Sequence, residues 1–185
     1  LSRVLLADDV DYYRRAREIF LKPPEQPNIY NTPRHWGCPY DCGLCPSHEQ
    51  HSCLTLIEVT DQCNLACPIC YAASGPHRPG FRSLATIEKM LDAVVANERE
   101  PDVVQISGGE PTLNPRLPEY IALARDLKVP EVELQTNAIK MADPEYAKIL
   151  WDSGLRQAFV SLHGITAKVS DRVTAAPKEA FTPRK

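Results

Sequence analysis

The feature that most restricts this chain is the placement of its cysteines. All seven lie between Cys38 and Cys70, and none follows in the rest of the sequence. A secreted disulfide scaffold favours an even number of cysteines spread over the chain. The first residues, LSRVLLADDV, are too short in apolar length and too acidic for a signal peptide. We therefore expect a cytoplasmic protein whose thiolates bind metal under reducing conditions.

The composition is that of a globular protein. The chain has 185 residues, of which 43% are hydrophobic and 24% charged, which excludes wholesale disorder and a fibrous repeat. No apolar run approaches the roughly 18 residues that cross a bilayer. The net charge is -3 without a block of Lys or Arg, which argues against a nucleic acid as the main partner.

The sequence predicts four segments in order. They are an N-terminal helix, a Cys-rich metal-binding segment, an α/β core and a disordered tail, at residues 1–22, 23–53, 54–165 and 166–185. Pro23 and Pro24 end the amphipathic helix expected over residues 8–21. The Cys-rich segment has many prolines and no periodicity, so it needs a metal staple in place of an apolar core.

The core predicts a parallel α/β sheet or barrel. Strands are expected at residues 54–59, 102–107, 132–136 and 158–163, with helices at 83–97, 117–128 and 144–153 between them. Ser83 is the expected cap of the first helix, and Asp143 and Gly154 bound the third. The first strand is expected to be buried on both faces, apart from Glu58. Strands that alternate with helices over short loops are typical of βαβ units.

The second group of cysteines has the spacing C-x3-C-x2-C, at Cys63, Cys67 and Cys70. It directly follows the first strand, and barrel active sites are built on loops at the carboxyl ends of strands. Three close thiolates can bind three irons of a [4Fe–4S] cluster and leave the fourth iron open to another ligand. A zinc ion would need a fourth ligand, and a loose trio of structural thiols is the alternative without metal.

A second motif, Gly108-Gly109-Glu110-Pro111, follows the second strand. Paired glycines at a strand end let a ligand touch the backbone, and Glu110 adds an anion suited to an ammonium group. Alone, this sequence is more often a turn than a binding site. Because the three cysteines follow the preceding strand, the pair of motifs favours a binding site.

This combination resembles the radical S-adenosylmethionine (SAM) superfamily. The matching residues are the C-x3-C-x2-C cysteines, Tyr71 and the GGEP sequence, while Ile69 stands where the family often has an aromatic residue. The resemblance implies a partial TIM-type barrel and a [4Fe–4S] cluster whose open iron binds the amino and carboxylate groups of SAM. It implies reductive cleavage of SAM to a 5′-deoxyadenosyl radical that abstracts hydrogen from a C–H bond, with the electron coming from a flavodoxin or ferredoxin type of donor.

The resemblance and the strand ends together assign a set of residues to cofactor binding. The Gly108–Gly109 backbone and Glu110 would hold the SAM amino group. Two residues at the end of the third strand would lie near the ribose, and two at the end of the fourth would face cofactor or substrate. For the last four residues, a buried polar side chain with satisfied hydrogen bonds is the alternative. The set is Gly108, Gly109, Glu110, Pro111, Thr136, Asn137, Ser161 and His163.

The first group of cysteines predicts a second metal centre. Its members, spaced x3, x2 and x7, are Cys38, Cys42, Cys45 and Cys53. Four thiolates can close a second [4Fe–4S] cluster or bind a single iron or zinc ion. His48 and His51 lie in the same loop. They are alternative metal ligands, but because four thiolates are available we expect them to form hydrogen bonds to sulfur or solvent.

The string from Gly37 to Tyr71 resembles one branch of the superfamily more closely. That branch includes archaeal tetraether lipid synthases and the enzymes that methylate the pterin of methanogen cofactors, and its members share a Cys-rich prefix before the first barrel strand. The resemblance implies alkylation, methylation or C–C bond formation on a lipid or pterin-like substrate.

The predicted core is shorter than the family's barrel of six βα units. Four predicted strands leave a sheet edge exposed and half of a cofactor pocket unmade, and the chain begins at Leu1. We therefore expect a truncated form of a longer enzyme. Two hypotheses compete with a radical SAM enzyme: a catalytically inactive iron–sulfur module and a zinc-binding interaction protein.

Overall fold

The computed structural model describes residues 33–37, 40–41, 52–98 and 101–175. The chain divides into two compact units, Leu1–His51 and Ser52–Lys185. The helix predicted over residues 8–21 lies outside the described residues, as do three cysteines of the first group, Cys38, Cys42 and Cys45.

In the first unit, the side chain of Asp41 holds a tight turn. Its Oδ2 accepts hydrogen bonds from the backbone N–H groups of His35 at 2.8 Å, Trp36 at 2.7 Å and Gly37 at 2.7 Å. The bond from Trp36 is the main cause of the lowered pKa of Asp41, because N–H donors favour the charged carboxylate. The φ angle of +81° at Gly37 suits a glycine. The turn therefore orders the backbone just before the first predicted ligand, Cys38.

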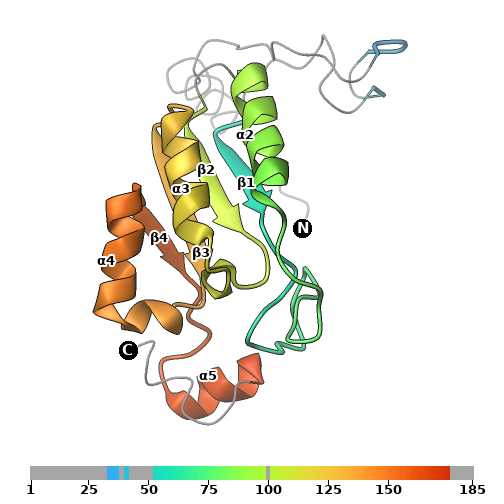
Figure 1. Cartoon of the computed structure of the whole chain (residues 1–185). Helices are drawn as coiled ribbons and strands as arrows, with labels where there is room; N and C mark the ends of the chain where they lie inside the picture. The colour runs from blue at the N-terminus through green and yellow to red at the C-terminus, as the bar shows by residue number, and fades with distance from the viewer. Residues whose placement is uncertain (1–32, 38–39, 42–51, 99–100, 176–185) are drawn as a thin grey trace, which may run out of the picture. The chain divides into compact units, whose positions relative to one another are not determined.

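The second unit contains a four-stranded parallel sheet in the order β1-β2-β3-β4 (Figure 1). The strands are β1 (Leu54–Glu58), β2 (Val103–Ser107), β3 (Glu131–Thr136) and β4 (Gln157–Val160). The pairing runs in register across the sheet, with Leu56 beside Gln105 and Gln105 beside Glu133. The predicted α/β class is confirmed, and because the strands are parallel, all of their carboxyl ends lie at one edge.

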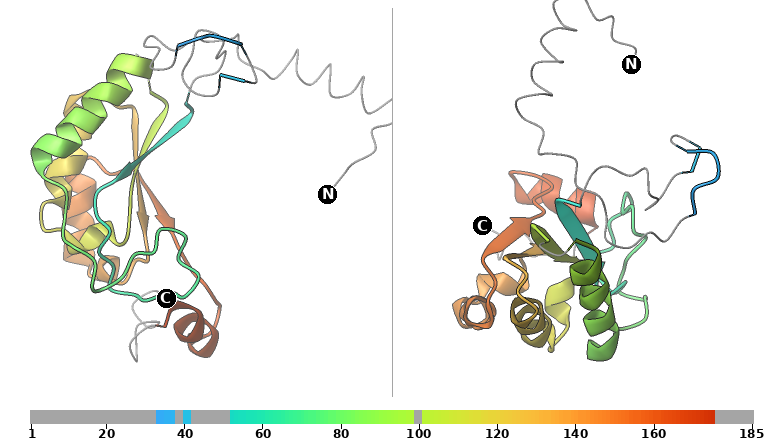
Figure 2. Two further views of the ribbon diagram at one scale, coloured as in Figure 1. Left: turned by 90° about the vertical axis from the view of Figure 1, so that its right-hand side faces the viewer. Right: turned by 90° about the horizontal axis from the view of Figure 1, so that it is seen from above.

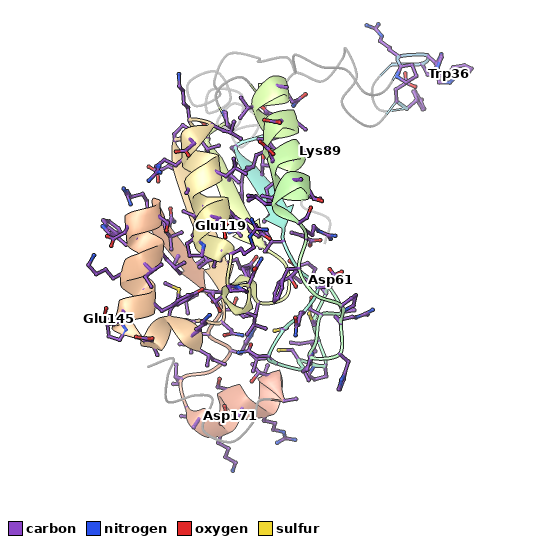
Figure 3. All side chains as sticks on the ribbon, viewed as in Figure 1. Trp36, Asp61, Lys89, Glu119, Glu145 and Asp171 are labelled. Carbon is purple, nitrogen blue, oxygen red and sulfur yellow. The ribbon has the colours of Figure 1, made fainter. Side chains whose placement is uncertain are left out.

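Helices cover one face of this sheet. Figure 2 shows them on the same side of the strands: α2 (Leu84–Glu98), α3 (Leu117–Asp126) and α4 (Pro144–Ser153). Their apolar sides pack on alternate strand residues such as Val104 and Leu134, both of which are fully buried. Lys89, Glu119 and Glu145 lie on the outer sides of these helices (Figure 3).

The helix ends are fixed by the residues that the sequence indicates. Ser83 Oγ accepts a hydrogen bond from Thr86 N at 3.1 Å before α2. Asp143 Oδ1 accepts one from Glu145 N at 3.0 Å before α4, and Gly154 follows α4 with a φ of +117°. Each side-chain cap satisfies a backbone donor that the helix itself leaves unpaired. Short 3-10 helices follow β2 (Pro111–Leu113) and β3 (Lys140–Ala142).

The opposite face of the sheet is polar at its centre. Gln105 donates a hydrogen bond to Glu133, and Ser107 donates one to Gln135 at 2.6 Å. On β1, Leu56 is 53% exposed on this face, so the expectation of a first strand buried on both faces is wrong. The helices cover only the other face, which carries Ile57. No helix in the described residues is long and apolar enough to cross a membrane.

The interpretation of residues 166–185 as a disordered tail is wrong for its described part. The helix α5 (Ala167–Thr174) follows Thr166, whose Oγ1 accepts a hydrogen bond from Val169 N at 3.4 Å. Its buried side chains, Ser170 and Thr174, are small and polar, whereas the other α-helices bury large apolar side chains. Thr174 O accepts a hydrogen bond from Ala66 N at 3.3 Å, which joins α5 to the loop that carries the second cysteine group.

Candidate functional site

The three cysteines of the second group lie in a closed loop after β1. Thr60 forms an antiparallel bridge with Phe81, and Gln62 forms a parallel bridge with Gly75. Thr60 Oγ1 also donates a hydrogen bond to Gly80 O at 2.9 Å. The loop, residues 60–81, is therefore pinned at two levels, which holds the cysteines over the carboxyl ends of the strands.

Most of the predicted site residues line one cavity of about 220 Å³. Cys63, Cys67 and Cys70 line it, and each is a partly buried cysteine outside any disulfide. Of the residues predicted to bind cofactor, those that line the same cavity are Gly108, Gly109, Thr136, Asn137, Ser161 and His163. The ends of β1, β2, β3 and β4 thus contribute to a single site.

The thiol of Cys63 lies in a partly desolvated position. Burial raises the pKa of Cys63 to about 11, and the nearby Glu110, Cys67 and Cys70 add to the rise. The backbone N–H of Leu65, whose nitrogen lies 3.4 Å from Cys63 Sγ, donates a hydrogen bond to the sulfur and lowers this pKa. A bound metal would supply the positive charge that makes the thiolate stable here.

Three thiols that line one cavity are a donor set that a [4Fe–4S] cluster can use. Within the described ranges, no group of three or more His, Cys, Asp or Glu side chains is gathered closely enough to hold one metal ion. In a [4Fe–4S] cluster each thiolate binds its own iron, so the sulfurs surround the cluster at its corners. Three thiols around one cavity, whose lining contains no carboxylate, match that arrangement.

Gly108 and Gly109 bring the loop after β2 against the cysteine loop. Gly109 N donates to Thr60 O at 2.7 Å, and Glu110 N donates to Gln62 O at 2.8 Å. A Cβ on Gly109 would overlap the carbonyl oxygen of Gln62 and lie 2.6 Å from its carbonyl carbon. At Gly108, where φ is +123°, a Cβ would overlap Thr60 O. Contact between two backbones, which the sequence does not reveal, therefore requires both glycines.

Glu110 lies behind the cavity wall with its carboxylate turned into the protein. Its Oε1 accepts hydrogen bonds from Thr112 N at 3.1 Å, Thr112 Oγ1 at 2.5 Å and Thr136 Oγ1 at 2.7 Å. Its Oε2 accepts one from Asn137 N at 2.7 Å, and the residue is 0% exposed. Neither Glu110 nor Pro111 is among the residues that line the cavity. The side chain therefore joins the loop after β2 to the end of β3.

Asn137 continues this connection to the cysteine loop. Its Oδ1 accepts a hydrogen bond from Ile139 N at 3.1 Å, which leaves Nδ2 to donate to Asn64 Oδ1 at 2.7 Å. Asn64 directly follows the first cysteine of the motif. The chain of bonds from Glu110 through Asn137 to Asn64 therefore links three strand ends. Asn64 is not among the site residues predicted from the sequence.

A second support lies under the 3-10 helix after β2. Thr112 O accepts hydrogen bonds from Lys140 Nζ at 2.9 Å and from the Tyr146 hydroxyl at 3.2 Å. Lys140 Nζ also lies 4.2 Å from the centre of the Tyr146 ring. Burial raises the pKa of Tyr146 to about 12, so its hydroxyl keeps the proton that it donates.

The first cysteine group is represented in the described residues by Cys53 alone. It is a free, exposed cysteine directly before β1. The second metal centre predicted for this group therefore remains a prediction.

Residues 57–181 match the model of the Radical SAM superfamily. The chain belongs to the radical SAM superfamily. This membership agrees with the resemblance found in the sequence. It implies a [4Fe–4S] cluster and SAM as cofactors, which the cavity's donor set fits.

Other radical SAM proteins resemble this chain over most of its length. It is 40% identical over 144 residues to 7,8-dihydro-6-hydroxymethylpterin dimethyltransferase from Methanocaldococcus jannaschii, a match that covers 76% of the chain and 28% of that relative. It is 36% identical over 132 residues to mycofactocin maturase MftC from Mycobacterium ulcerans, covering 71% of the chain and 34% of that protein. The chain therefore spans about a third or less of these relatives.

The fold of solved radical SAM proteins is similar as well. The structure of Streptococcus suis SuiB bound to precursor peptide SuiA aligns with a TM-score of 0.58 at 19% identity. The alignment covers 72% of this chain and 29% of SuiB. At this identity the likeness concerns the fold alone, and it agrees with the predicted class of partial barrel.

Proposed function

We propose that this chain is the cluster-binding and SAM-binding part of a radical SAM enzyme. The observation that supports the proposal is the shared cavity, which is lined by three thiols, by two glycines and by the ends of β3 and β4. The family membership of residues 57–181 supports the same assignment.

In this proposal, different residues of the cavity bind the cluster and SAM. Cys63, Cys67 and Cys70 would each bind one iron, and the backbone of Gly108 and Gly109 would receive the SAM ammonium group. With both cofactors bound, the cluster supplies the electron for reductive cleavage of SAM to a 5′-deoxyadenosyl radical. The apolar side chains of Leu65 and Ile69 line the same cavity and would help to exclude water.

The ends of β3 and β4 would orient the rest of SAM. Thr136 and Asn137 would lie near the ribose, while Ser161 and His163 would face cofactor or substrate. Glu110 would act indirectly, because its carboxylate accepts hydrogen bonds from the Asn137 backbone and the Thr136 hydroxyl. It would hold the pocket's shape and leave the ammonium contact to the glycine backbone.

We infer a methylation or other alkylation of a pterin-like substrate for the whole protein. The support is the similarity to the Methanocaldococcus jannaschii relative, which is named as a pterin dimethyltransferase. The Cys-rich segment at residues 23–53 would add a second metal centre before the core at 54–165. A flavodoxin or ferredoxin type of donor would supply electrons, and the thiolate chemistry suits the cytoplasm.

Anaerobic reconstitution of the full chain tests the metal assignment. Two cubes would give roughly eight irons per chain, and a cube with one further iron about five. A Cys67→Ala variant should lose the iron of the second group, whereas Cys53→Ala should affect only the first. Zinc without iron would overturn the proposal in favour of a zinc-binding protein.

The cleavage reaction is tested by adding SAM and dithionite to the reconstituted protein. The product to measure is 5′-deoxyadenosine, which should form with the unchanged chain and disappear in Cys67→Ala. Product that survives Cys67→Ala would contradict the assigned cleavage site. In a full-length version of the protein, a loaded cluster that never yields product would support the inactive iron–sulfur module instead.

A further inference from the structure

Ser74 is a polar residue of the cysteine loop that no assignment above uses. Its Oγ is buried and has no hydrogen-bond partner among the described residues. A buried hydroxyl without a partner is unfavourable, so such a group in a native protein points to a partner of another kind. Of the buried side-chain atoms that share this property in the described ranges, Ser74 Oγ is the one that belongs to the cysteine-lined cavity.

The surroundings of Ser74 indicate which partner it serves. Ser74 lines the cavity described above and also a second cavity on the cysteine loop, of about 370 Å³. Cys67 and Cys70 are the cysteines that line both cavities as well. Ser74 therefore shares the wall between the cavities with two predicted iron ligands, whereas Gly108 and Gly109 line the first cavity alone.

The backbone on both sides holds Ser74 in this place. Ala73 N donates to Cys70 O at 3.1 Å, and Ala73 has a left-handed φ of +48°. On the other side, Gly75 N donates to Asp61 O at 3.3 Å, and Gly75 O accepts from Cys63 N at 3.2 Å. The backbone at Ser74 is thus held by bonds from its two neighbours to two cysteines of the motif.

We propose that the Ser74 hydroxyl donates a hydrogen bond to an anionic sulfur of the bound cluster, either a sulfide or the thiolate of Cys67 or Cys70. This inference rests on the proposed function. A hydroxyl is a donor that a sulfur anion can accept, and hydrogen bonds to sulfur are among the factors that set a cluster's reduction potential. The bond stabilises the reduced cluster, which carries one more negative charge, and so raises the potential.

The test is a redox titration of the reconstituted full chain without SAM, followed by electron paramagnetic resonance of the reduced cluster. Ser74→Ala should shift the reduction equilibrium toward the oxidised form about tenfold, which is ~59 mV lower for a one-electron couple. Ser74→Thr keeps the hydroxyl and should retain the original potential. Ser170→Ala is the matched control, because Ser170 Oγ is also buried without a partner but lines neither cavity.

Each result has a defined meaning. An unchanged potential in Ser74→Ala with full iron content would overturn the inference and leave the proposed function standing. The same would follow if Ser74→Ala weakened SAM binding alone, because the acceptor would then be SAM. An equal fall in Ser74→Thr and Ser74→Ala would also overturn it. A chain that binds no iron in any variant would overturn the proposed function itself.

Discussion

Replacing Glu110 by Gln tests whether this side chain holds the site together. Glutamine keeps one acceptor oxygen, which can take the position of Oε1 and accept hydrogen bonds from the same three donors. Its amide NH₂ then faces Asn137 N, which now donates to Oε2 at 2.7 Å. The Asn137 N–H loses its acceptor and the new amide NH₂ has none, and each of these two buried groups left without a partner costs about 1–3 kcal/mol. We therefore expect Glu110→Gln to lower the free energy of unfolding by about 3 kcal/mol.

Urea unfolding of the full chain, followed by circular dichroism, measures this change. With a slope of about 2 kcal/mol per molar urea, the midpoint should fall by about 1.5 M. The matched control is Glu119→Gln, which also removes one carboxylate. Glu119 is exposed and pairs with Arg116 at 2.7 Å on the surface of α3, so its midpoint should hardly move. If both variants unfold at the same urea concentration, Glu110 does not have the structural role assigned to it.

Three further variants test two loops of the candidate site and, separately, the turn held by Asp41. Gly109→Ala should lower the urea midpoint and the iron content, because its Cβ would overlap the Gln62 carbonyl, whereas Gly80→Ala has nothing within 4 Å and should leave both unchanged. Asn137→Ala should raise the KM for SAM more than it lowers kcat in an assay of 5′-deoxyadenosine, since it releases Asn64; an unchanged KM would argue against that link. Asp41→Ala should reduce the iron of the first cysteine group and spare SAM cleavage, as measured by iron per chain and by product.

The elements of the core could be predicted because local signals suffice for them. Ser83, Asp143 and Gly154 mark helix ends through bonds and angles within a few residues of themselves. The helix α5 lacks such a signal except for the cap at Thr166, since its buried side chains are small and polar. Local chemistry thus predicts helices with an apolar face and misses one packed through polar residues.

The candidate site, too, could be predicted only in part from the sequence. The spacing of the cysteines and the order of the strands suffice to bring Cys63 and Asn137 to one cavity, because parallel strands end at the same edge. The direction of the Glu110 side chain depends on Thr136 and Asn137, which lie at the end of another strand. The role of Asn64 and the buried hydroxyl of Ser74 depend on the folded loop in the same way. Contacts between segments that are distant in the chain have no local signal in the sequence from which they could be predicted.

The contact between the loop after β2 and the cysteine loop affects how related sequences should be compared. Gly108 and Gly109 are required by the backbone of Thr60 and Gln62 whether or not a cofactor is bound. A descendant that lost its chemistry but kept its fold would therefore retain the glycine pair. Selection on the cysteines would relax at once, because none of the three takes part in the core. In related sequences, loss of the cysteines should thus indicate loss of activity. The glycine pair should be retained in inactive relatives and should indicate only shared ancestry.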